Sequence, residues 1–304
     1  MTPPDHNLAF TSLRDARRDR KAEHIELALE SRMQMTRNFF DDFRFEHQAL
    51  PEIDLESIDL SVTFLGKRLE SPLLISCMTG GTDEATRINR NLARAAQESG
   101  IAVGVGSQRK ALEDASTEES FRIRPFAPGV PVLANLGAVQ LNYGVGLDEC
   151  VRAVRMIDAD ALVFHVNALQ EALQPEGQTN FDGLIPKMGD IARSLGVPVI
   201  VKEVGCGVDP RTARRMIAEG IRIIDTAGTG GTSWARIEAA RSGDLETGEL
   251  FADWGIPTPL AIRRLREVRG LTIVGSGGVR NGIDVAKAIA SGAVSYTHLT
   301  LPTN

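Results

Sequence analysis

The chain has 304 residues, of which 42% are hydrophobic, so it can bury one large core, and its length also permits two domains. The formal net charge of −6 argues against general nucleic-acid binding but leaves room for a local basic pocket that binds a small anionic ligand. Cys77, Cys150 and Cys206 lack metal-ligand spacing and favour a reduced, cytoplasmic setting over a disulfide framework. Without a signal-peptide pattern or a long apolar run, no membrane association is expected.

Residues 1–70 are expected to form an N-terminal basic entry segment that packs on the main domain. The stretch 11–31 has the mixed charge and composition of a helix and contains Arg20, Lys21 and His24. Charge patterning alone fits a solvated helix face equally well. A strand-like run at 61–65 ends at Gly66.

From residue 71 the chain alternates short apolar runs with helical segments, which is typical of a parallel α/β fold. The expected strands are 73–78, 102–106, 131–135, 161–167, 198–204, 221–226, 272–275 and 294–299. The expected helices are 83–99, 147–157, 183–195, 210–218, 259–268 and 283–290, with Thr258 as the N-cap of the fifth. Eight such units favour a TIM (β/α)8 barrel over residues 71–293, rather than an open doubly wound sheet.

The apolar run that begins at residue 161 ends in polar residues up to residue 171. Period-two alternation places Val163, His165 and Asn167 on one face of a strand, while the other face is wholly apolar. A strand that is apolar on both faces is typical of a parallel sheet covered by helices. Gln170 and Glu171 follow at the carboxyl end, where such barrels carry their active sites.

The other expected strands also end in polar, glycine-rich turns. These begin at Met78, Gly106, Asn135, Lys202 and Thr226. Each turn taken alone could be ordinary loop punctuation. Because parallel strands end on one rim, together they predict a common site there.

The turn after the seventh strand contains Gly277, Gly278 and Arg280 and runs directly into a helix. Successive glycines let backbone N–H groups approach a phosphate, and a helix N-terminus adds a favourable dipole. This is also where TIM barrels usually bind phosphate. The sequence therefore predicts a phosphate loop here.

Two charged residues suggest ligands. Lys202 lies in an apolar strand, where a buried ammonium needs a negatively charged ligand, a paired carboxylate or the loss of its proton. Glu203 points to the opposite face and is a poor partner. Glu171 is the candidate Mg²⁺ ligand, because magnesium takes one or two carboxylates beside substrate phosphates; alone it would be a solvated loop residue.

Eight motifs in order resemble the type 2, FMN-dependent isopentenyl-diphosphate isomerases. They are RKAEH (20–24), MTGG (78–81), VGSQR (105–109), ANLG (134–137), HVN with QE (165–171), VKEVG (201–205), GGTSW (230–234) and SGGVR (276–280). The resemblance covers about residues 18–293.

The resemblance implies an isomerase of isoprenoid biosynthesis that interconverts isopentenyl and dimethylallyl diphosphate with reduced FMN as acid/base, Mg²⁺, and NAD(P)H as reductant. It also implies a cytoplasmic homo-oligomer, tetrameric or larger. FMN would be held by Met78, Thr79, Gly80, Ser107, Asn135, Lys202, Thr232, Gly277, Gly278 and Arg280. The substrate would face Arg20, Lys21, His24, Ser107, Gln108, Arg109, His165, Asn167 and Gln170, and Glu171 would bind the metal.

Residues 294–304 depart from the family pattern. They have strand propensity but bring neither the glycine turn nor the closing helix expected there, so the closing unit of the barrel is expected to be truncated or replaced. Two other functions stay open: an FMN-dependent 2-hydroxyacid oxidase or dehydrogenase, and an inactive flavin-binding protein. The first would need a histidine base near 226–234, where none occurs.

Overall fold

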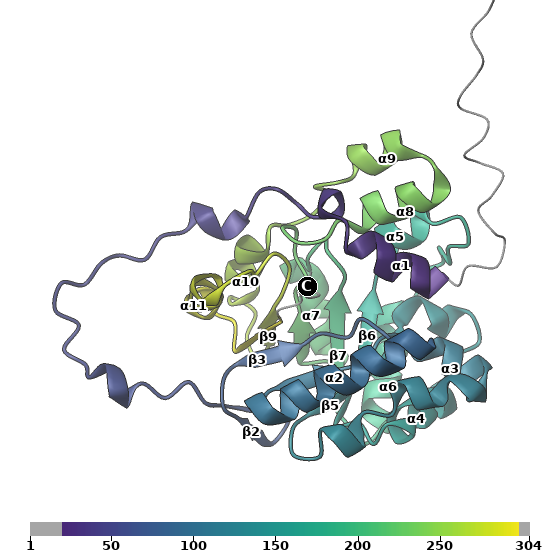
Figure 1. The fold of residues 1–304 in the computed structure, drawn as a ribbon, viewed down its shortest axis with the longest axis horizontal. Helices are drawn as coiled ribbons and strands as arrows, with labels where there is room; N and C mark the ends of the chain where they lie inside the picture. The colour runs from purple at the N-terminus through teal and green to yellow at the C-terminus, as the bar shows by residue number, and fades with distance from the viewer. Residues whose placement is uncertain (1–19, 298–304) are drawn as a thin grey trace, which may run out of the picture.

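The computed structural model describes residues 20–297 as a closed parallel barrel surrounded by helices (Figure 1). The eight barrel strands follow the order β10-β3-β4-β5-β6-β7-β8-β9, and every neighbouring pair is parallel. The predicted TIM barrel is therefore confirmed. No helix among the described residues is long and apolar enough to cross a membrane.

The strands are β1 (Val62–Phe64), β2 (Lys67–Leu69), β3 (Leu73–Ile75), β4 (Ala102–Gly104), β5 (Val132–Gly137), β6 (Ala161–Val166), β7 (Val199–Glu203), β8 (Ile223–Asp225), β9 (Thr272–Gly275) and β10 (Ser295–Thr297). The helices are α1 (Arg20–Ala28), α2 (Asp83–Ser99), α3 (Arg109–Glu113), α4 (Leu147–Met156), α5 (Ala168–Leu173), α6 (Leu184–Ser194), α7 (Pro210–Ala218), α8 (Trp234–Ser242), α9 (Leu245–Leu250), α10 (Thr258–Leu265) and α11 (Gly282–Ser291). Short 3-10 turns include η1 (Ser31–Met33), η2 (Phe39–Asp42) and η3 (Leu55–Ser57).

All eight predicted strands and six predicted helices are present, with differences at their ends. Most strands are shorter than expected, because residues at their ends have already left the sheet for the connecting loops. Thr258 was wrongly expected to be an N-cap: it is the first residue of α10, after Pro257. The small helices α5, α8 and α9 were not expected.

The last strand occupies the eighth position of the barrel. Backbone pairing joins β10 to β9 at Ser295–Val274 and to β3 at Leu73–Tyr296, so the departing sequence still closes the sheet. A strand needs only backbone hydrogen bonds and a tolerable side-chain pattern, which explains why unlike sequence can fill this position. The tail from 298 to 304, which includes the end of the expected strand 294–299, lies outside the described residues.

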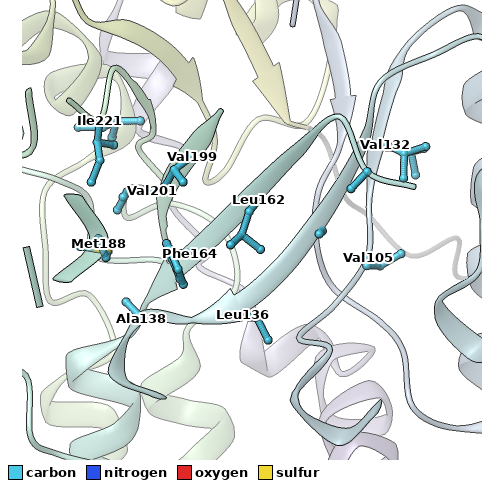
Figure 2. Packing of buried hydrophobic residues seen from close by; sticks show 14 of the residues in the cluster. Val105, Val132, Leu136, Ala138, Leu162, Phe164, Met188, Val199, Val201 and Ile221 are labelled. Atoms are coloured by element: carbon cyan, nitrogen blue, oxygen red, sulfur yellow. The ribbon is translucent and has the colours of Figure 1, made fainter. Parts of the chain in front are cut away.

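The core has two layers, and strand alternation separates them. Leu162, Phe164, Val199 and Val201 point outward against the surrounding helices (Figure 2). The inner cluster of the barrel instead contains Leu74, Ala102, Leu133, Ala161, Val163, Ile200 and Val274. The alternation expected along the 161–167 run is thus confirmed.

Both ends of the barrel are covered by the N-terminal part of the chain. Phe64 and Leu69, from the β1–β2 hairpin, join the inner cluster beside the first residues of the barrel strands, so the hairpin closes the amino end. At the other end, α1 lies near α8, and Met33 and Met35 exchange backbone hydrogen bonds with Ser233 and Gly231. The segment 20–35 therefore lies against the rim where the polar turns meet.

Candidate active site

Polar side chains replace the apolar inner layer near the carboxyl ends of β5, β6 and β7. Asn135, His165 and Lys202 lie on these adjacent strands, and β-pairing places His165 directly beside Lys202. Nδ1 of His165 lies 2.9 Å from Oδ1 of Asn135. Below them, Leu133, Val163 and Ile200 form the apolar floor. The interior of the barrel is therefore polar at the carboxyl ends of these strands and apolar below them.

Two buried amide atoms at this rim make no hydrogen bond within the described structure. They are Nδ2 of Asn135 and Oδ1 of Asn167, on side chains that are 1% and 4% exposed. A buried polar atom without a partner lowers the stability of the fold, because it has lost its hydrogen bonds to water and gained none within the protein. A donor and an acceptor are therefore available for a bound molecule.

Lys202 is 6% exposed, and its Nζ donates to the backbone oxygen of Glu203 at 2.8 Å. Register places Asp225 of β8 beside it, on a strand whose preceding inner residue, Ile223, packs against the inner cluster. The sequence left open that Lys202 pairs with a carboxylate, and register identifies Asp225 as the candidate, a residue that the sequence did not indicate. Ser276 donates its hydroxyl to Asp225, so the carboxylate also ties β8 to the glycine loop.

Glu203 points the other way, as expected, and its carboxylate accepts backbone N–H groups from Val204, Gly205, Cys206 and Gly207. Burial raises the pKa of Glu203, although these N–H donors oppose the effect. The Glu203 carboxylate therefore stabilises the turn after β7 and does not pair with the Lys202 side chain, which lies on the inner face of the barrel.

Gly277 and Gly278 have φ values of +98° and +73°. A Cβ on Gly277 would lie 2.0 Å from the oxygen of Gly228, so only glycine permits this close approach of the two loops. Thr258 donates its hydroxyl to the oxygens of Ser276 (2.9 Å) and Gly277 (2.7 Å). The loop is therefore rigidly built, as a phosphate cradle requires.

The helix after this loop contributes less than expected. Asn281 caps α11 by accepting from the N–H groups of Ile283 and Asp284, and Asp284 accepts from that of Arg280. These donors are already used, so the expected phosphate contact at the helix N-terminus is not supported for them. The Arg280 guanidinium donates to the oxygens of Met35 (2.6 Å) and Gly230 (3.2 Å).

Lys21 is brought from α1 onto the turns after β3 and β4. Its Nζ donates to the oxygens of Gly80 (2.7 Å) and Ser107 (3.0 Å) and lies 4.9 Å from the centroid of the Phe121 ring. Arg20 begins α1, but its side chain lies outside the described ones. Lys21, Gly80 and Ser107, three predicted site residues that are distant in sequence, therefore lie together.

The remaining predicted residues of the β3 turn have different surroundings. Met78 is half-exposed at the rim, whereas Thr79 is buried and donates its hydroxyl to Asn89 of α2. Gly80 lies against the Phe121 ring, which leaves no room for a Cβ. Thr232 accepts from Nε2 of Gln34 at 2.8 Å and lines a small hollow with Gln170 and Trp234.

His24 and Gln170 converge on Glu238 of α8. Nε2 of Gln170 donates to Oε1 of Glu238 at 2.7 Å, and Nε2 of His24 lies 3.0 Å from the same oxygen. The other oxygen of Glu238 is 2.6 Å from Arg241. Burial favours a raised pKa for Glu238, but His24, Gln170 and Arg241 outweigh it and hold the pKa below its ordinary value.

Glu238 is fully buried, and the sequence reasoning missed it. The available signal was a glutamate and an arginine three residues apart on a short helix that directly follows a rim motif. The Arg241 guanidinium also pairs with Glu23 of α1 and with Glu176. This cluster fixes α1 to the barrel.

Glu171 lies on α5 among hydrogen-bond donors. It accepts from Nδ2 of Asn167 at 3.0 Å, from Gln174, and from the backbone N–H of Gln178 at 2.7 Å. Arg109 is 3.4 Å from Oε1 of Gln178 and also pairs with Glu113. Among residues 20–297, no group of three or more His, Cys, Asp or Glu side chains could hold a metal ion, so Glu171 would act with ligand oxygens.

Gln108 is placed differently from the substrate role expected for it. It is fully buried, its Nε2 donates to the oxygen of Ala153 in α4 at 2.9 Å, and its Oε1 accepts from the N–H of Asn135 at 3.0 Å. The amide therefore joins the barrel wall to an outer helix. This position does not support direct contact with a substrate at the rim.

Comparison with known proteins identifies relatives over nearly the whole chain. An "FMN-dependent dehydrogenase" family model matches residues 20–129. Isopentenyl-diphosphate delta-isomerase of Nostoc sp. is 50% identical over 96% of this chain and 84% of its own length. The proteins of that name from Rickettsia akari (46% identity, 96% and 84% covered) and a Synechococcus strain (48%, 90% and 80%) are also similar.

Proposed function

Because the chain belongs to the isopentenyl-diphosphate delta-isomerase family and is an isomerase of isoprenoid biosynthesis, we propose that its reaction uses reduced FMN and Mg²⁺ at the rim of the barrel. The reaction interconverts isopentenyl diphosphate and dimethylallyl diphosphate. It moves a double bond by adding one proton to carbon and removing another, with no net oxidation. The site must therefore bind a diphosphate and manage protons beside a five-carbon chain.

The residues present fit FMN. The unpaired Nδ2 of Asn135 is a buried donor suited to a ring carbonyl or nitrogen, and Lys202 supplies a cation on the neighbouring part of the inner face. Gly277 and Gly278 form a tight loop at the usual phosphate position of a TIM barrel. The buried Nδ2 of Asn135 is the observation that carries this proposal, because it makes no hydrogen bond within the described chain and the nearby Cys77 thiol is only a weak acceptor.

When bound, reduced FMN would supply the acid and base that act on carbon. Lys202 would stabilise negative charge on the reduced flavin, since its ammonium lies in a low-dielectric interior where such pairing is strong. His165, Asn167 and Gln170 would orient the substrate, with the unpaired Oδ1 of Asn167 as a buried acceptor. The apolar inner layer would exclude water from the site.

The diphosphate would lie among Lys21, Arg109 and Glu171. Lys21 reaches the rim from α1, and Arg109 is linked through Gln178 to Glu171. Mg²⁺ bound by Glu171 and the diphosphate oxygens would need only this one carboxylate. The lysine and arginine would neutralise the remaining charge. Ser107, whose backbone oxygen accepts from Lys21, would lie between the cofactor and the substrate.

NAD(P)H would supply the electrons that reduce FMN, and we place the reaction in the cytoplasm and in a homo-oligomer of four or more chains. The three cysteines make no disulfide, which fits a reducing compartment. The family-model match keeps a 2-hydroxyacid oxidase or dehydrogenase as the second candidate. The absence of a histidine in the turn after β8 argues against it.

A direct assay tests the proposal. Protein supplied with FMN, Mg²⁺ and dithionite should convert isopentenyl diphosphate to its allylic isomer, and omission of Mg²⁺ or reductant should abolish turnover. A lactate or glycolate substrate should give no flavin reduction. Replacing FMN by its 5-deaza analogue should remove activity; undiminished turnover would rule out a flavin acid/base.

A further inference from the structure

Residues 44–60, called here the arm, leave the body of the protein between η2 and the β1–β2 hairpin (Figure 1). Every residue of the arm is exposed. Its hydrogen bonds to the described residues are local, around Asp54 and Asp59, and Asp59 forms an ion pair with Arg68 of β2 at 3.6 Å. The arm therefore gains little support from the described part of its own chain.

The arm is nevertheless rich in large apolar side chains. Leu50 and Leu55 are 83% and 81% exposed, and the same stretch exposes Phe45, Ile53, Ile58 and Leu60. A continuous set of this kind on a folded protein marks a surface that another macromolecule covers. The base of the arm is fixed, because Lys287 of α11 donates to the oxygen of Phe40 and Arg263 of α10 stacks on Phe43.

The charge of the arm restricts its partner. It carries Glu46, Glu52, Asp54, Glu56 and Asp59 against one basic residue, Arg44, so its net charge is −4. A strongly acidic partner, and a nucleic acid above all, would be repelled. The complementary surface must offer cations beside an apolar contact.

This chain carries such a surface itself. Leu260, Arg263, Arg264, Arg266 and Glu267 line a hollow at α10, and the adjacent helix α7 exposes Arg211, Arg214 and Arg215. We call these six arginines with Leu260 the arginine face. Within residues 20–297 none of the six forms an ion pair, in a chain whose overall charge is −6.

We propose that the arm of one copy docks on the arginine face of a second copy of this chain. The leucine and isoleucine side chains of the arm would cover the hollow at Leu260, and its carboxylates would pair with Arg264 and Arg266. Because each molecule supplies one arm and one face, this contact closes an assembly either by exchange between two copies or as a ring of four. The argument depends on exposure and charge and is independent of the proposed chemistry.

Light scattering of the purified chain, with charge reversal on either side, tests the contact. The wild-type chain should have a mass above that of one chain. Glu46→Lys with Glu56→Lys, or Arg264→Glu with Arg266→Glu, should each lower it, and the two pairs combined should restore it. Glu98→Lys on the exposed part of α2 is the control for changed charge and should leave the mass unaltered. A wild-type monomer, or one unchanged mass throughout, would overturn the proposal.

A cross-linking experiment separates a neighbour's arm from a self-folded one. A mixture of two single variants, Glu56→Cys and Arg264→Cys, should form a disulfide-linked dimer on mild oxidation, and Glu98→Cys with Arg264→Cys should not. A disulfide that forms only within a chain carrying both cysteines would contradict docking between copies. The proposal would also be contradicted if the wild-type chain bound a short DNA duplex and the Arg264→Glu, Arg266→Glu variant lost this binding with its mass unchanged. The arginine face would then bind a polyanion.

Discussion

Oε1 of Glu238 accepts the amide of Gln170 at 2.7 Å and lies 3.0 Å from Nε2 of His24. One buried carboxylate thus links a residue that follows β6 to the N-terminal helix. The two linked residues are 146 positions apart in sequence, and both are expected to face the substrate. The arrangement of the substrate side of the site therefore depends on α8.

Glu238→Gln should disturb both partners while retaining the shape of the side chain. Glutamine keeps one acceptor oxygen but places an N–H donor where the other oxygen was, so either Gln170 or Arg241 loses its acceptor and the buried negative charge is lost, at about 1–3 kcal/mol of stability. We expect a fall in melting temperature and a rise in KM for the diphosphate substrate. Thermal melts and initial rates measure both. Glu249→Gln removes an exposed carboxylate that pairs with Arg236 and serves as the control; equal effects of the two changes would contradict a special role for Glu238.

The docking of α1 should weaken in acid. The pKa of Glu238 is lowered in the folded protein, so its charge stabilises the fold above its ordinary value of 4.5 and this contribution is lost as pH falls through the folded pKa. The other ionisable groups of this cluster are Glu23, His24, Glu176 and Arg241. Fluorescence of Trp234, whose ring meets His24 edge-on, should report the change.

Two variants isolate this acid transition. Trp254→Phe removes the other tryptophan, so that the signal comes from Trp234. Glu238→Gln in that background should flatten the fluorescence change below pH 4.5, the ordinary pKa of a glutamate. An unchanged transition in the glutamine variant would assign it to another carboxylate.

Lys202→Met should weaken binding of reduced FMN. A charge-assisted contact in a buried site is worth about 1.5–3 kcal/mol, which corresponds to roughly a 10-fold to 100-fold change in affinity. Titration of the protein with FMN under reducing conditions, followed by absorbance, measures this. Lys187→Met, which removes the charge of an exposed lysine on α6 that donates to Asn142, is the control for loss of a cation. Equal affinities in Lys202→Met and the wild type would show that the interior cation does not pair with the flavin.

Gly277→Ala should disrupt the loop after β9. Its φ of +98° disfavours any side chain, and a Cβ would overlap the oxygen of Gly228. Overpacking of this kind costs about 1–3 kcal/mol. We expect a lower melting temperature and reduced FMN content after purification. Gly282→Ala lies a few residues away with open space around the added methyl group, and its stability should stay near that of the wild type.

The sequence by itself determined the barrel and the direction of its inner side chains. Alternation along 161–167 placed His165 and Asn167 inside, and the order of apolar runs predicted eight parallel strands, because each pattern is local and repeats with the period of its element. It also located the glycine loop at 277–278 and the polar rim. The ends of the strands were less certain, since residues such as Ser76 and Thr226 can belong either to the strand or to the turn.

Only the tertiary structure decided which polar groups meet. Gln108 became part of the barrel wall because α4 offers it the carbonyl of Ala153, and Asp225 came to lie beside Lys202 through strand register. Glu238 joined the site because α8 packs against α1 and α5. Closure of the barrel by β10 depended on backbone pairing that unlike side chains also permit. These contacts join residues far apart in sequence, and local periodicity carries no information about them.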